Sequence, residues 1–550
     1  MRASRILSCA AALLLASANA APAGPRYQRS ALLPPITGAA PGVAPHGING
    51  LNFGPDGALY TASLIGPGIH RVDVTRGTLV EVVGAPQGEA DDIAAGPDGT
   101  LAWTALIAGE LRVRRPDGRV DTLATDLPLF NPVHFTADGR LFPFQRCQPD
   151  ALLEFDPDGR KPPRTNASGL GGINAFTDDG RGNLYVPLAA RGAIGRVDIA
   201  SGALTVLASG LGEPVAVKRD SKGGLATIDW QSGRVIHVDP VTGATRTIAI
   251  VTPPLDNLAI GPDDTIYVSR PSDNSIVAID PSTGAQRPLI QGALAAPGGL
   301  ALMQRAGRPT LLVSDAMGYR FVDASTGAVE MLPFDLLSNA SSSVAVTTKT
   351  LVLGYVRRPQ VTVIERASGR VLQSFKGFKA PMGVVALEDG TIFVADFGSG
   401  EILRLAPGQQ PDRAVLSSGL QGPTGLVLDP RGGLIVSEAS SGRLLHVDLA
   451  SGEQRVIARG LAQPEGIAML PGGDIAVAEV GARRLTRVTF ARGRDEGRPQ
   501  PIARDLPIGQ MFTRAPAPVY LPTGVAAGAD GTIYVVCDVD DTILKFTPRR

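Results

Sequence analysis

Polar side chains recur at one position of a repeated unit in the first half of this 550-residue sequence. The position, called here the entry position, comes immediately before the residue that opens a short apolar segment. It returns every 40 to 44 residues, apart from a final interval of 58. Its first six occupants are Asn49, Asp91, Asn131, Asn174, Val215 and Asp256. Five of the six carry a side-chain oxygen, and a hard divalent cation such as Ca²⁺ binds about six to eight oxygens. We therefore expect a cation site where these side chains converge.

The second half of the sequence carries different residues at the entry position. Its occupants are Gly298, Ser342, Met382, Thr424, Glu465 and Thr523. These include a single carboxylate, so we expect the cation in the first half only. Neither half has His or Cys at this position, which disfavours zinc. Another interpretation stays open, because Asn and Asp also suit turns, where they bond nearby backbone amides, and a water-filled channel would carry similar residues.

The repeat also predicts the architecture that would bring the entry positions together. Each unit holds four short apolar segments separated by Gly- and Asp-rich turns, as at residues 54–57. Four-stranded units of this length are typical of β-propeller blades, of which one propeller holds about four to eight. The twelve units therefore predict an all-β protein of two tandem six-bladed β-propellers, over residues 45–296 and 297–550. The first strand of each blade lines the central channel, so the entry residues of one ring should meet at its mouth.

The N-terminal residues predict export. Residues 1–20 combine two arginines, a short apolar run and a small-residue ending, a pattern typical of a cleavable signal peptide. We expect a periplasmic or secreted protein. Residues 21–44 form a leader. Because the last repeat lacks a fourth strand, residues 27–36 could close that blade, or they could lie extended on the surface.

The composition excludes several classes of partner. The chain has 52 basic and 52 acidic residues, whereas a protein that binds nucleic acid needs a basic face. The apolar run of the signal peptide is too short to span a membrane, and no other stretch approaches the required length. The cysteines that come after the signal peptide, Cys147 and Cys537, lie far apart in the sequence, and we expect two buried free thiols. The expected partners are small molecules or proteins.

Three motifs of the first half carry a resemblance to a known superfamily. They are Asn49-Gly50-Leu51, Ile173-Asn174 and Asp256-Asn257-Leu258, each followed by a Gly-rich turn and a strand. They resemble the six-bladed senescence marker protein and gluconolactonase family, the paraoxonases and diisopropyl fluorophosphatase, which hold Ca²⁺ or a similar ion and hydrolyse lactones or phosphoesters. The resemblance implies as metal ligands Asn49, Asn131, Asn174, Asp256 and Asn257. The early Glu ligand of that superfamily has no clear counterpart in this sequence.

The residues and the resemblance together predict an exported, divalent-metal-dependent hydrolase of lactone or related ester type. The ion would polarise the carbonyl oxygen, and a carboxylate would activate water. Asp256 and Asp91 are the candidate bases. A carboxylate bound to a cation is a weaker base, so Asp91 is the better candidate if it lies off the metal. His46, near the first strand entry, is a further catalytic candidate.

Two other functions stay open. One is a non-catalytic double propeller that binds a ligand or a protein partner, the latter through the second propeller. The other is a lyase, because residues 96–101 and 115–120 resemble repeats of virginiamycin B lyase. The His and Glu metal site of that enzyme has no match among the five scattered histidines of this sequence.

Overall fold

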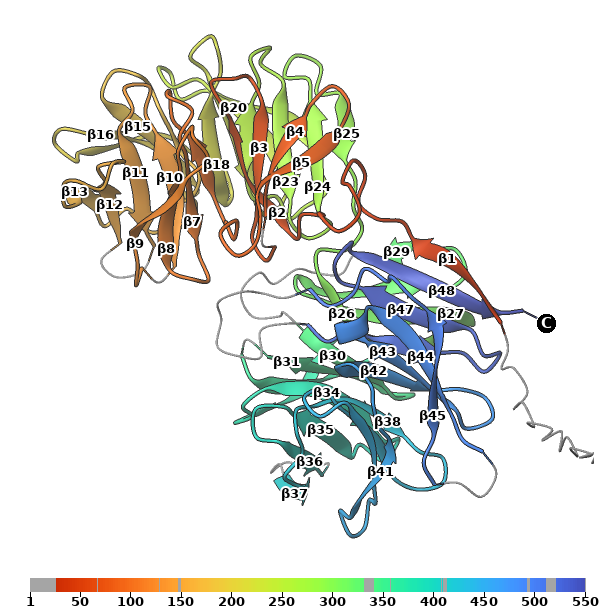
Figure 1. Ribbon diagram of the computed structural model, residues 1–550. Helices are drawn as coiled ribbons and strands as arrows, with labels where there is room; N and C mark the ends of the chain where they lie inside the picture. The colour runs from red at the N-terminus through yellow and green to blue at the C-terminus, as the bar shows by residue number, and fades with distance from the viewer. Residues whose placement is uncertain are drawn as a thin grey trace, which may run out of the picture.

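The chain folds into twelve four-stranded antiparallel sheets arranged as two tandem six-bladed β-propellers (Figure 1), which confirms the predicted fold class. The computed structural model describes residues 26–66, 68–127, 129–146, 150–330, 341–356, 358–406, 408, 413–491, 495–510 and 521–549. The predicted signal peptide and Cys147 lie outside these residues, and Cys537 is a buried free thiol. In the part of the chain that is described, no helix is long and apolar enough to cross a lipid bilayer.

Each blade of the first propeller consists of four consecutive strands that pair in chain order. The blades are β2 (Ile48–Phe53), β3 (Leu59–Ser63), β4 (Ile69–Asp73), β5 (Thr78–Val83); β6 (Ile93–Ala95), β7 (Leu101–Ala105), β8 (Glu110–Arg114), β9 (Val120–Ala124); β10 (Phe130–Phe135), β11 (Leu141–Gln145), β12 (Ala151–Glu154), β13 (Arg164–Ser168); β14 (Thr177–Asp178), β15 (Asn183–Leu188), β16 (Ala193–Asp198), β17 (Leu204–Ser209); β18 (Pro214–Arg219), β19 (Leu225–Asp229), β20 (Arg234–Val238), β21 (Thr245–Ile250); and β22 (Leu258–Ile260), β23 (Ile266–Arg270), β24 (Ser275–Ile279), β25 (Gln286–Ile290).

Five blades of the second propeller have the same order. They are β26 (Pro297–Arg305), β27 (Arg308–Asp315), β28 (Gly318–Asp323), β29 (Val329–Glu330); β30 (Ser341–Val346), β31 (Thr350–Tyr355), β32 (Gln360–Glu365), β33 (Val371–Lys376); β34 (Pro381–Ala386), β35 (Ile392–Asp396), β36 (Glu401–Leu405), β37 (Arg413–Ser417); β38 (Pro423–Leu428), β39 (Leu434–Glu438), β40 (Arg443–Val447), β41 (Gln454–Ala458); and β42 (Pro464–Met469), β43 (Ile475–Glu479), β44 (Arg484–Thr489), β45 (Arg498–Ala503). Two one-turn 3-10 helices interrupt the strands, η1 (Ala189–Arg191) and η2 (Val480–Ala482).

The last blade is closed by a strand from the other end of the chain. It consists of β46 (Val525–Ala527), β47 (Ile533–Cys537), β48 (Thr542–Pro548) and β1 (Tyr27–Leu33). β1 runs antiparallel to β48 with Tyr27 opposite Pro548, and both strands lie in the second propeller in Figure 1. The leader therefore forms the outer strand of this blade, which covers an otherwise open sheet edge.

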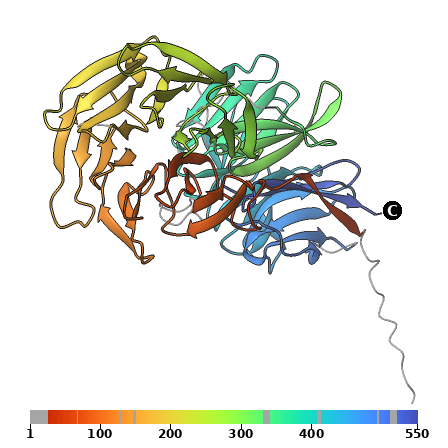
Figure 2. The ribbon, with the colours of Figure 1, turned by 90° about the horizontal axis from the view of Figure 1, so that it is seen from above.

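The first strands of the blades surround the centre of each ring. In the first propeller β2 lies against both β6 and β22, and in the second β26 lies against both β30 and β46. Seen from above, the strands of the first propeller surround a common centre (Figure 2). The repeated turns set the strand spacing: at residues 54–58 the Asp56 carboxylate accepts the Ala58 N–H at 3.1 Å, and Gly57 has a φ of 73°. Apolar side chains from neighbouring blades fill the space between the sheets, as Phe142 and Phe176 do.

Candidate active site at the mouth of the first propeller

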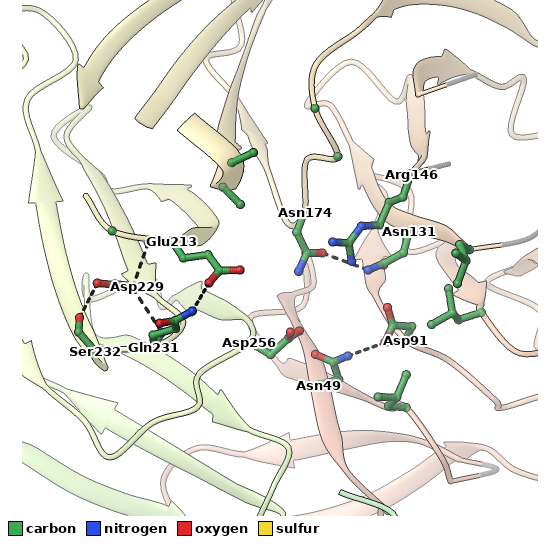
Figure 3. Close-up of a pocket in the computed structure, with 18 residues that line it drawn as sticks. Asn49, Asp91, Asn131, Arg146, Asn174, Glu213, Asp229, Gln231, Ser232 and Asp256 are labelled. Carbon is green, nitrogen blue, oxygen red and sulfur yellow. Dashed lines mark hydrogen bonds between the residues drawn. The ribbon is translucent and has the colours of Figure 1, made fainter. Parts of the chain in front are cut away.

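A cavity of about 890 Å³ opens at the mouth of the first propeller (Figure 3). Its lining includes the five oxygen-bearing entry residues of this ring, Asn49, Asp91, Asn131, Asn174 and Asp256. Asn49 and Asn131 lie in the first strands of their blades, and the other three lie two or three residues before theirs. Shared backbone bonds hold neighbouring blades in register at the mouth, where Gly50 N–H donates to the Asp91 carbonyl at 2.9 Å. The entry positions thus meet in one place.

One amide oxygen in this cluster has no partner. Asn49 donates through Nδ2 to Asp91 Oδ1 at 2.5 Å, and its own Oδ1 is buried without a hydrogen bond. On the other side, Asn131 Nδ2 donates to Asn174 Oδ1 at 3.0 Å. The Asn131 oxygen accepts the Thr104 hydroxyl at 3.3 Å. A buried acceptor without a partner is unfavourable, so Asn49 Oδ1 is suited to a cation or to a donor from a ligand.

The two carboxylates of the cluster are both buried, with 5% of each residue exposed. Burial raises the pKa of Asp91 well above its ordinary value, and the neighbouring charges of Asp256 and Asp92 raise it further. Burial also raises the pKa of Asp256 to about 7, although the Arg146 guanidinium acts in the opposite direction. Two carboxylates that repel each other in this way can share a proton near neutral pH or be neutralised by a cation.

Arg146 is a functional candidate that the repeat did not reveal. It comes directly after β11, its side chain is exposed, and it lines the same cavity. In Figure 3 its guanidinium lies beside Asn131 and Asn174. The acids that close the second strand in other blades, such as Asp229, correspond to Gln145, one residue earlier, so the repeat gave no signal for Arg146.

The opposite wall of the cavity comes from the fifth blade and carries a second polar group. Glu213 Oε2 accepts the Gln231 side-chain amide at 2.9 Å, and Asp229 Oδ2 accepts the Ser232 hydroxyl at 2.5 Å. The backbone N–H of Glu213 donates to Asp229 Oδ1 at 3.1 Å. Gly212 has a φ of 80°, and a β-carbon there would lie 2.2 Å from Asp229, so this turn requires glycine. Glu213 does not stand at an entry position, so the repeat did not single it out.

Asn257 does not join the other proposed ligands, which corrects the sequence expectation. Its side-chain amide donates to Asp92 Oδ1 at 2.9 Å, and its own oxygen accepts the Leu258 N–H at 2.8 Å. The residue is 1% exposed and is not part of the cavity lining. Both residues come just before β22. Asp256 lines the cavity at the mouth, whereas the Asn257 side chain is taken up by Asp92 and Leu258.

His46 also lies away from the cavity, which corrects its expected catalytic role. It is 1% exposed at the contact between the two propellers, with Nδ1 at 2.8 Å from Asp541 Oδ1. Asn274 donates to the other Asp541 oxygen at 2.8 Å. Burial lowers the pKa of His46 to about 4 and raises that of Asp541 well above its ordinary range. His46 therefore joins the two rings.

The described residues do not contain the kind of acidic cluster found in many metal sites. Among them, no group of three or more His, Cys, Asp or Glu side chains is arranged to hold a metal ion. A cation at this mouth would therefore depend on amide oxygens as well as on carboxylates.

Comparisons with known proteins add similarities of fold. No protein-family model and no curated protein matches the sequence. A chain in the crystal structure of a nidogen/laminin complex is similar at 19% identity and a TM-score of 0.38, over 42% of this chain and 91% of that one. The extracellular domain of a hybrid two-component system from B. thetaiotaomicron is similar at 11% identity and a TM-score of 0.32, over 94% of this chain and 82% of that one.

Proposed function

We propose that the first propeller hydrolyses a lactone or a related ester at this cavity with the help of a divalent cation such as Ca²⁺. The observation that carries the proposal is the partnerless oxygen of Asn49 beside the buried carboxylates of Asp91 and Asp256. A cation there would satisfy the amide oxygen and relieve the repulsion between the carboxylates. Asn131 and Asn174 complete the candidate ligand set. The resemblance to the gluconolactonase and paraoxonase superfamily supports the same assignment.

The residues of the chain would divide the chemistry between them. A bound cation would supply the positive charge that polarises the carbonyl oxygen of the ester. Asp91 would take a proton from the attacking water, because burial and neighbouring charge raise the pKa of its carboxyl toward the range useful for a base. Arg146, exposed in the cavity, would stabilise negative charge that develops on the substrate. We also propose that residues 1–20 direct export to the periplasm or the medium.

Calcium titration followed by thermal unfolding tests the cation site. We expect the melting temperature to rise with free Ca²⁺ and a chelator to reverse the rise. The stabilisation should reach about 2.7 kcal/mol at a hundredfold excess over Kd. Asn49→Ala and Asp256→Asn should abolish the response, whereas Thr424→Ala, at an entry position of the second propeller, should keep it. Equal melting with and without Ca²⁺ in the wild type would remove the cation from the proposal.

A panel of lactones and esters then tests hydrolysis. Wild-type protein should release acid from at least one member, and Asp91→Asn should reduce kcat by about a hundredfold or more, the usual contribution of a general base. Hydrolysis by the wild type that Asp91→Asn leaves unchanged would exclude this base.

A non-catalytic ligand-binding propeller is the second candidate. It is favoured by Arg146, which already places a positive charge at the mouth, and by the lack of a three-membered acidic or His cluster among the described residues. Binding of a small molecule without turnover, in the presence and absence of Ca²⁺, would support this function over hydrolysis.

A further inference from the structure

The cavity is much larger than a metal ion requires. Its volume of about 890 Å³ lies in the range of organic-ligand pockets, about 300 to 1,000 Å³. Asn49, Asp91 and Asp256 occupy one side, and Glu213 with its neighbours occupies the other (Figure 3). A ligand that reacts near Asp256 would therefore extend toward the fifth blade, where its far end meets different chemistry.

The charges of the lining are unequal. Four acidic residues line the cavity, and Arg146 is the basic residue among the described lining residues. Asp229 is paired with Arg234 at 3.2 Å and accepts several hydrogen bonds. If a cation bound near Asp256 offsets the charge of the Asp91 and Asp256 pair, the lining carboxylate that stays without a positive partner is Glu213.

Glu213 is held in place to act as a recognition group. Its backbone N–H donates to Asp229, and its carbonyl accepts the Trp230 N–H at 3.0 Å. One carboxylate oxygen accepts the Gln231 amide, which orients the side chain and leaves the other oxygen available. Figure 3 shows this carboxylate pointing from the fifth blade into the cavity. A carboxylate oriented in advance binds an ammonium group through short, charge-assisted hydrogen bonds.

Small residues form another part of the cavity wall, beside the fifth blade. Gly171, Gly172, Ala189 and Ala190 of the fourth blade line the same cavity. None of them carries a side chain longer than a methyl group, so an alkyl chain can pass over them without a polar partner. The lining thus offers polar groups around Asp256, an acidic group at Glu213, and a wall of small residues beside Glu213 along which an alkyl chain can lie.

We infer that the ligand of this cavity is an ester or lactone that carries an ammonium group on an alkyl chain, and that Glu213 selects it. The part of this inference that concerns the ester or lactone group rests on the proposed hydrolytic function. The part that concerns the ammonium group rests on Glu213 alone, and binding measurements can test it.

The test compares two probes of nearly equal shape by isothermal titration calorimetry, with Ca²⁺ and with chelator. The probes are Nα-acetyl-lysine methyl ester and Nα-acetyl-norleucine methyl ester, which differ in the terminal ammonium. The wild type should bind the lysine ester at least tenfold more tightly. Glu213→Gln should remove that preference, and Glu213→Lys should reverse it toward Nα-acetyl-glutamate α-methyl ester. Glu453→Gln, at an exposed residue of the second propeller, should keep the wild-type preference.

Several results would overturn the inference. These are equal binding of the two probes by the wild type, binding of neither, or a preference that survives in Glu213→Gln. Hydrolysis is measured separately. If the protein prefers the lysine ester but hydrolyses neither ester, the proposed hydrolysis is wrong and the role of Glu213 stands. If it hydrolyses both esters with equal kcat/KM, the proposed hydrolysis stands and the role of Glu213 is wrong.

Discussion

The centres of the two propellers are built from equivalent strands and differ in the residue that comes directly after the entry position. In the second ring these residues are mostly glycines: Gly299, Ser343, Gly383, Gly425, Gly466 and Gly524. A β-carbon on Gly383 or on Gly466 would lie 2.1 Å from a backbone oxygen of the next blade. The first ring carries one glycine there, Gly50, and five larger residues: Asp92, Pro132, Ala175, Ala216 and Asn257. Glycine lets neighbouring backbones meet directly, while side chains hold them apart.

As a consequence, the second ring has a closed centre and the first ring has an open mouth. The second ring keeps about 60 Å³ at its centre, against about 890 Å³ at the mouth of the first. Backbone bonds cross between its blades, as from Gly466 N–H to the Thr523 carbonyl at 3.0 Å. We infer that glycine next to the entry position, present in five blades of the second ring and in one of the first, lets the centre close and leaves the entry side chains no room to surround a ligand.

Loops at the mouths differ as well. In the second ring, acids that close the second strands accept backbone N–H groups of the loop before the first strand, as Asp396 does from Lys379 and Ala380 at 2.9 and 2.6 Å. Asp229 plays this part in the fifth blade of the first ring, whereas the second strands of the other blades end in Ser63, Ala105, Gln145, Leu188 and Arg270. Hydrogen bonds from the loop to a strand-closing carboxylate hold the loop at the mouth and favour a rigid, closed mouth.

The largest effect should come from removing β1, because the second ring depends on it for closure and the first does not. Deleting residues 26–33 should abolish cooperative folding of the second propeller, a loss comparable to the whole ~5–15 kcal/mol stability of a domain. Both tryptophans of the chain, Trp103 and Trp230, lie in the first propeller. Their fluorescence should therefore keep its unfolding transition while far-UV circular dichroism loses part of its amplitude. Loss of both signals together would show that the first ring also requires β1.

An exchange of residues next to the entry position tests the glycine explanation directly. Gly466→Ala should destabilise the protein by about 3 kcal/mol, because its methyl group meets the Thr523 carbonyl of the next blade. Ala175→Gly, the reverse change in the first ring, should cost about 1 kcal/mol. Urea unfolding measures both. Equal effects in the two rings would contradict the proposed difference in backbone approach.

A smaller, pH-dependent effect is expected at Glu465, the carboxylate at an entry position of the closed ring. Burial raises its pKa from 4.5 to about 8. Between these values the folded protein keeps a proton that the unfolded chain releases, so the contribution of this residue to the free energy of unfolding falls as pH rises. Glu465→Gln keeps the acceptor for Thr523 and should be more stable than the wild type by about 1 to 3 kcal/mol at pH 8, with little difference at pH 4. A constant difference across this range would show that the carboxyl does not titrate as expected.

The repeat in the sequence was sufficient to predict the fold, because each blade is a local unit with its own turns and apolar strands. It also predicted which entry side chains share one mouth, since a fixed period places equivalent residues at equivalent points of a ring. Arg146 and Glu213 fall outside the entry position, so the period gave no reason to place them there. His46 meets Asp541 across 495 residues of sequence, a contact that no local pattern records.

The pairing of β1 with β48 has one more consequence, for the connection between the rings. Because β1 belongs to the second ring and precedes the first, residues 48–290 are an insertion within the chain of the second propeller. Two covalent links, over residues 34–47 and 291–296, therefore join the rings. Two links restrict rotation of one ring against the other more than a single link would. Leu64, which lines the cavity, also belongs to a buried apolar cluster that includes Met317 of the other ring.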